Sequence, residues 1–200
     1  MISSKAMGWM LIMGIIAFAI MTLSWAIQGN QNGTAETVAW AAASSDWENV
    51  GMVRMLGLFL MTVFMTGFIS WARSINNSSS AIAIGSNFAL FSVLLLWVGL
   101  ICSIAGYDTA SDNTSAAFGL IKLGNIASWF SGTLVGLSFF LIGLSSYRQK
   151  VGVPTLTGLL AIMGLAATVG NFILFWVWIG AFGLGMLILA IIGLQKIKGD

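Results

Sequence analysis

Few residues in this chain could act on a substrate or hold a metal ion. The 200-residue sequence contains no histidine and a single cysteine, Cys102. Histidine is the commonest metal ligand and general base in proteins, and one thiolate cannot hold a metal cluster. We therefore expect no catalytic residue, no metal site and no bound cofactor. The protein is predicted not to be an enzyme.

Arg54 is the charged residue with the most functional interest. It precedes a long apolar run and closely follows two acids, Asp46 and Glu48. An arginine in this position could bind an anion or an acidic group of a partner. It could also reach the lipid headgroups or pair with its neighbouring acids. We favour the structural roles, and the contact to expect is an outer ion pair of Arg54 with Asp46 or Glu48.

Polar side chains within the apolar runs are mild, and the main ones are Ser131, Thr168 and Asn171. They could line a path for a neutral solute. They could instead bond to a neighbouring helix, each for about 1 kcal/mol. We favour the second interpretation. Because no aspartate or glutamate falls within a predicted span, a proton relay of intramembrane carboxylates is not expected.

Small residues recur at every fourth position in one segment: Gly124, Ser128, Gly132 and Gly136. On a helix this spacing places them along one face, and Gly132 and Gly136 form a GxxxG element. Such a face lets a second helix approach closely. The pattern predicts tight helix packing, but it leaves open whether the neighbour belongs to this chain or to another protein.

The composition indicates a lipid environment. Hydrophobic residues make up 58% of the chain and charged residues 7%, whereas about a quarter of the residues of a soluble domain are charged. Crossing the hydrocarbon core takes about 20 apolar residues. The sequence predicts one all-α membrane domain over 1–200, a bundle of six transmembrane helices at 7–28, 52–72, 81–106, 126–147, 155–176 and 179–195.

The last two of these spans are separated by an inferred turn. No charged residue occurs between Pro154 and Leu194, and this stretch is about twice as long as one span needs. We place the turn near Trp178–Gly180, with Trp176 and Trp178 in an interfacial aromatic belt. The first span is longer than the apolar core of a signal peptide, so it is expected to be a membrane anchor.

Charge predicts the orientation of the bundle. With alternating spans, one side carries mostly bases, accompanied only by Asp200: Lys5, Arg73, Arg148, Lys150, Lys196 and Lys198. The other side carries mostly acids, accompanied by Arg54 and Lys122: Glu36, Asp46, Glu48, Asp108 and Asp112. The positive-inside rule then places both termini in the cytoplasm, as expected for a prokaryotic plasma membrane. A net charge of +2 gives no reason to expect a nucleic-acid partner.

Two outer loops are predicted, at 29–51 and 107–125. The first has a helix-favouring middle that begins near Glu36 and contains Trp40, typical of a short interfacial helix. The second turns apolar toward its end, so it either extends the fourth span or forms another interfacial segment. Glycosylation sequons begin at Asn32 and Asn113.

The sequence leaves two functions open. One is a non-catalytic accessory subunit that packs against other membrane subunits through its small-residue faces and outer loops. The other is a small transporter or channel for a neutral or weakly polar solute. The absence of catalytic and ion-coupling groups favours the accessory subunit.

Overall fold

The chain is entirely helical in the part that the computed structural model describes, residues 2–29, 33–76 and 78–199. Asn32 and Asp200 lie outside these ranges. The described residues form seven helices: α1 (Ser4–Gln28), α2 (Thr34–Ala43), α3 (Trp47–Ile75), α4 (Ser80–Thr109), α5 (Thr114–Arg148), α6 (Pro154–Ile173) and α7 (Phe175–Lys198). All except α2 are long and apolar enough to cross a membrane. The predicted six-span helical bundle is confirmed, and the chain is an integral membrane protein.

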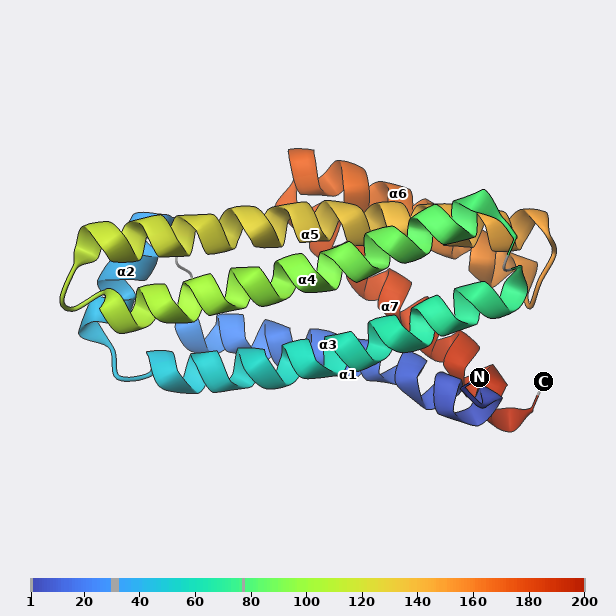
Figure 1. The fold of residues 1–200 in the computed structure, drawn as a ribbon, viewed down its shortest axis with the longest axis horizontal. Coiled ribbons are helices and arrows are strands. Elements are labelled where there is room, and N and C mark those ends of the chain that lie inside the picture. The colour runs from blue at the N-terminus through green and yellow to red at the C-terminus, as the bar shows by residue number, and fades with distance from the viewer. Residues whose placement is uncertain (1, 30–32, 77, 200) are drawn as a thin grey trace.

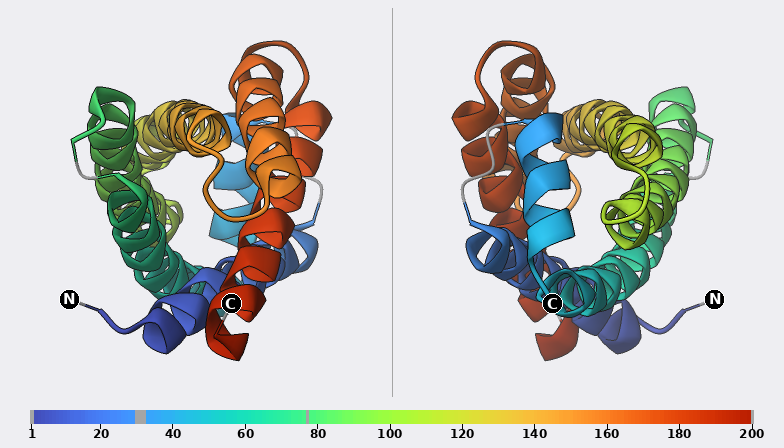
Figure 2. Two further views of the ribbon diagram at one scale, coloured as in Figure 1. Left: turned by 90° about the vertical axis from the view of Figure 1, so that its right-hand side faces the viewer. Right: turned by 90° about the vertical axis from the view of Figure 1, so that its left-hand side faces the viewer.

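The six long helices are arranged as a closed ring. Each packs most extensively against its neighbours in the order α1, α3, α4, α5, α6, α7 and back to α1, and Figure 2 shows this ring from both ends. The two termini lie at the same end, together with the α3–α4 and α5–α6 connections (Figure 1). We call this the terminal end, and the opposite end the α2 end.

The predicted helix in the first outer loop is α2. It crosses the bundle at the α2 end (Figure 2, right) and packs against α4 and α5. Val38 and Ala41 of α2 are buried in a small apolar cluster with Tyr107 and Ile121. The sequence predicted a short helix in the membrane interface. The structure shows in addition that α2 packs onto the bundle through these contacts.

The turn between the last two spans lies a few residues before the predicted Trp178–Gly180, at Leu174. Leu174 has an extended backbone, its N–H donates to the Gly170 carbonyl, and its own carbonyl accepts from the Trp178 N–H. A side chain at Gly170 would come within 2.7 Å of the Trp178 nitrogen, so this glycine allows the tight reversal. Trp178 therefore lies inside α7, while Trp176 is 78% exposed beside the turn.

The predicted second outer loop is mostly helical. α4 continues to Thr109 and α5 begins at Thr114, where the Asn113 side chain accepts a hydrogen bond from the Ala116 N–H. With 35 residues, α5 is about 52 Å long, against about 30 Å for the 20 residues of α6. The α4–α5 hairpin therefore extends past the α6–α7 turn toward the α2 end (Figure 1).

Aromatic side chains of three alternate helices of the ring meet in its buried core. Trp71 stacks on Phe68, which contacts Phe139 edge-on at a centroid distance of 5.2 Å. Phe139 stacks on Phe182, and Phe182 stacks on Trp178. We call these residues the aromatic column, and Phe64 joins it by contacts with both Phe68 and Phe139. The column joins α3, α5 and α7 across the ring.

A non-glycine residue in a left-handed conformation follows the end of α5. Lys150 has φ 54°. Its N–H donates to the Tyr147 carbonyl, and the Val151 N–H donates to the Ser146 carbonyl. This bonding is a Schellman motif, whose left-handed position is usually glycine because a Cβ there is strained.

Replacing Lys150 with glycine is expected to stabilise the protein by about 0.5–1 kcal/mol, because the strain is relieved. The measurement is the thermal unfolding midpoint in a mild detergent. Lys150→Ala is the matched control, since it removes the same charge and keeps the Cβ. An equal rise in both variants would show that the charge, and not the backbone, is responsible.

Candidate functional site

Arg54 lies at the centre of a polar cluster near the α2 end. Its guanidinium donates hydrogen bonds to Ser24 Oγ (3.2 Å), to the Gln28 carboxamide oxygen and to the Tyr107 hydroxyl. The predicted ion pair with Asp46 or Glu48 does not form, and Arg54 takes these neutral partners instead. The reason is geometric: Arg54 is about two turns into α3 and faces α1 and α4.

The Arg54 cluster connects three helices of the ring. Ser24 and Gln28 belong to α1, Arg54 to α3 and Tyr107 to α4. The three partners of Arg54 are buried. The Tyr107 ring also contacts Trp40 of α2 edge-on at a centroid distance of 5.7 Å. Hydrogen bonds to a charged donor are the stronger ones, so this arrangement is suited to holding α1, α3 and α4 together beneath α2.

Each polar residue suggested for a pathway makes a hydrogen bond within the protein. The Ser131 hydroxyl is buried and donates to the Ser92 carbonyl of α4 at 2.8 Å. The Thr168 hydroxyl donates to the Gly164 carbonyl of its own helix. The Asn171 amide donates to the Trp129 carbonyl and the Thr133 hydroxyl of α5. Two of the three, Ser131 and Asn171, make bonds between helices.

The predicted small-residue face contacts three neighbours, all within this chain. Gly124 and Ser128 lie against Gly99 of α4, where a Cβ on Gly124 would be 2.7 Å from the Gly99 carbonyl oxygen. Gly132 lies against Trp178 of α7, and Gly136 against α6. An α-helix has 3.6 residues per turn, so residues spaced by four shift gradually around the helix axis. The small residues along α5 therefore face one neighbouring helix after another.

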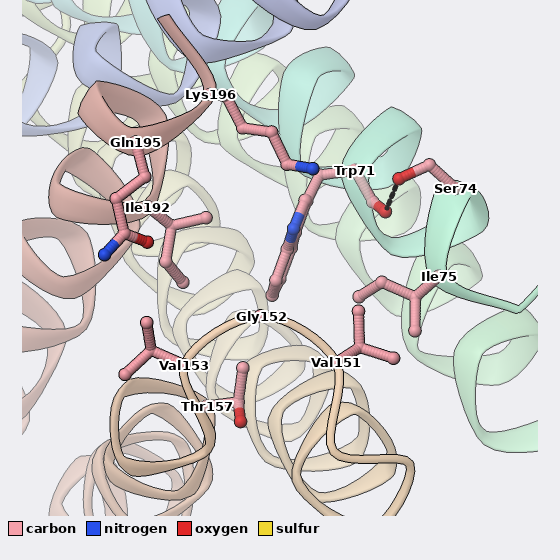
Figure 3. A pocket seen from close by; sticks show the side chains of 10 residues that line it. All are labelled: Trp71, Ser74, Ile75, Val151, Gly152, Val153, Thr157, Ile192, Gln195 and Lys196. Carbon is pink, nitrogen blue, oxygen red and sulfur yellow. Dashed lines mark hydrogen bonds between the residues drawn. The ribbon is translucent and has the colours of Figure 1, made fainter. Parts of the chain in front are cut away.

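A cavity of about 400 Å³ opens at the terminal end, where no sequence pattern indicates a site. Figure 3 shows it between the ends of α3 and α7 and the α5–α6 connection. Trp71, the terminal member of the aromatic column, forms one wall. The lining residues are Trp71, Ser74, Ile75, Val151, Gly152, Val153, Thr157, Ile192, Gln195 and Lys196.

The polar groups of this cavity fall into two sets. The hydroxyls of Ser74 and Thr157 already donate to backbone carbonyls of Trp71 and Pro154. Lys196 and Gln195 bring an ammonium group and an amide. Among residues 2–29, 33–76 and 78–199, no carboxylate lines the cavity, and its one charged lining residue is Lys196.

The Gly99–Gly124 contact can be tested by adding one methyl group. Gly124→Ala should destabilise the protein by about 1–3 kcal/mol, because the new Cβ forces α4 and α5 apart. Gly119→Ala on the same helix is the matched control, since a Cβ there meets nothing within 4 Å, and it should be neutral or stabilising. Equal thermal midpoints for the two variants would contradict the close helix contact.

The Arg54 cluster can be tested by a double-mutant cycle. Arg54→Met and Tyr107→Phe should each lower the free energy of unfolding, because each removes a partner from the same hydrogen bond. The expected coupling energy is about 0.5–3 kcal/mol, measured by unfolding in mixed micelles. Strictly additive effects would show that the guanidinium and the phenol act independently.

No protein-family model matches this chain, and no curated protein or solved structure is significantly similar to it.

Proposed function

We propose that this protein is a non-catalytic accessory subunit of a larger membrane protein complex. The observation that carries the proposal is the aromatic column, which joins α3, α5 and α7 across the interior of the helix ring. A channel or transporter needs a polar path across the bilayer. Here large apolar rings pack where such a path would run, and the protein is better suited to structural support than to conduction.

Internal hydrogen bonding supports the same proposal. Ser131 and Ser138 of α5 donate to the Ser92 and Gly85 carbonyls of α4, both at 2.8 Å. Trp97 of α4 donates to Thr62 of α3. These polar groups make contacts between neighbouring helices, which favours a rigid bundle over one that alternates between two openings.

The surface proposed for a partner lies where the α6–α7 hairpin ends beside the longer α5. Trp129 and Phe172 contact each other there at a centroid distance of 4.8 Å. We call this surface the outer step, and its exposed residues are Trp129, Phe130, Phe172, Ile173 and Trp176. Exposed aromatic residues clustered in this way are typical of protein interfaces.

The charge distribution supports an orientation for the subunit. The bases Lys5, Arg73, Arg148 and Lys196 all lie in helix-terminal segments at the terminal end. We infer from the positive-inside rule that this end faces the cytoplasm, and that the outer step faces the opposite surface of a prokaryotic plasma membrane.

The alternative function is a small transporter for a neutral or weakly polar solute. The cavity at the terminal end favours it, because the cavity adjoins Trp71 at the end of the aromatic column. Movement of the column would have to open the path. Reconstituted liposomes test this alternative: glycerol or urea flux above that of empty liposomes would contradict a purely structural role.

The outer step can be tested by photo-cross-linking in the native membrane. A benzophenone amino acid at Phe172 or Trp176 is expected to capture a second membrane protein. The same amino acid at Phe91 of α4, also exposed and on another side of the ring, is the control and should capture only lipid. Equal protein capture from all three positions, or from none, would contradict the outer step as the contact surface.

A further inference from the structure

The cavity at the terminal end combines an apolar wall with a cationic rim. Trp71 and Ile192 are buried, and Ile75, Val151 and Val153 complete the apolar lining. The ammonium group of Lys196 and the amide of Gln195 come from the last turns of α7 (Figure 3). The cavity therefore has two chemically different parts, one apolar and one that donates hydrogen bonds.

The donor groups in the cavity have unused capacity. Within the described ranges, the side chains of Lys196 and Gln195 and the indole N–H of Trp71 make no hydrogen bond or ion pair with the rest of the protein. Lys196 contributes only its backbone carbonyl, which accepts from Ser4 Oγ at 3.4 Å. An ammonium group and an indole N–H are donors without acceptor capacity, so the group that they would bind is an acceptor, and an anion satisfies Lys196 best.

The apolar walls of the cavity favour an anion that carries an apolar chain over a small hydrated anion. Sites for small organic ligands measure about 300–1,000 Å³ and are mostly apolar with a few placed polar groups, and this cavity of about 400 Å³ fits that description. A free phosphate ion would leave the walls formed by Ile75, Val153 and Ile192 in contact with water. An apolar chain attached to the anion would cover them.

We propose that this cavity binds an anionic amphiphile, with a phosphate or carboxylate head at Lys196 and an apolar chain against Trp71 and Ile192. The terminal ends of six apolar helices mark a membrane surface, where such molecules are concentrated. Two sources present this chemistry: an anionic membrane phospholipid and a free single-chain acid. The proposal concerns a different site from the outer step and does not depend on the accessory-subunit function.

The first experiment measures binding to the full-length protein after delipidation in dodecyl maltoside, a neutral detergent with a twelve-carbon chain. Native mass spectrometry counts bound dodecyl phosphate and dodecanoate, and the change in thermal midpoint follows the affinity. One molecule bound per chain is expected. Dodecyltrimethylammonium, with the same chain and a cationic head, and inorganic phosphate, with no chain, should each bind at least about tenfold more weakly, since each lacks one of the two contacts.

Variants then locate the binding site. Lys196→Gln should weaken dodecyl phosphate binding about tenfold or more, because a charge-assisted hydrogen bond is lost. Lys198→Gln is the matched control: it removes the same charge from a position of the same helix that does not line the cavity. Trp71→Phe keeps an apolar wall and removes the N–H, and a smaller loss is expected. The thermal midpoint without ligand verifies that each variant is folded.

Two results would overturn the proposal. One is equal binding of dodecyl phosphate to the Lys196→Gln and Lys198→Gln variants; the other is equal binding of inorganic phosphate or of the cationic amphiphile to the unmodified protein. If the proposal holds, a competition experiment identifies which of the two classes of amphiphile the cavity binds. Displacement of dodecyl phosphate by phosphatidylglycerol in nanodiscs indicates a membrane phospholipid, and displacement by dodecanoate alone indicates a free single-chain acid.

Discussion

The close approach of helix backbones at glycine holds this structure together. Inside a bilayer, helices gain little by hiding apolar side chains from lipid, so packing and interhelical hydrogen bonds must hold them. In the part of the chain that the structure describes, three contacts of the ring have glycine on both sides: Gly8 with Gly193, Gly99 with Gly124, and Gly136 with Gly164. At the first, a Cβ on Gly193 would be 2.6 Å from the Gly8 carbonyl oxygen. These contacts join α1 to α7, α4 to α5 and α5 to α6.

The interior of the ring is occupied by side chains that connect helices which are not neighbours. Helices that touch mainly their two neighbours meet across the ring through side chains, and here Phe68, Phe139 and Phe182 make stacked and edge-on contacts. Aromatic pairs of this kind add about 0.5–1.5 kcal/mol beyond their burial. The column ends at Trp71, beyond which the cavity begins. Trp71 therefore belongs both to the aromatic core and to the wall of the cavity.

Sequence reasoning predicted the spans because length and charge identify membrane helices directly. It did not predict which faces turn inward, since α4 and α7 are apolar all round and lipid is as apolar as a protein core. The spacing of Phe64, Phe68 and Trp71 on one helical face was the available signal for the column.

The residues that line the cavity come from three segments that are far apart in the sequence, so no local pattern could indicate it. For Arg54 the sequence suggested nearby acidic partners, whereas its neutral partners lie on other helices.

The most direct test of the accessory-subunit function is native mass spectrometry of the protein extracted from its own membrane with a surrounding lipid disc. An accessory subunit should be recovered in a stoichiometric complex with at least one other membrane protein, and charged substitutions at Phe172 and Trp176 should dissociate that complex. A single chain or a homo-oligomer, isolated intact under the same gentle conditions, would contradict this function.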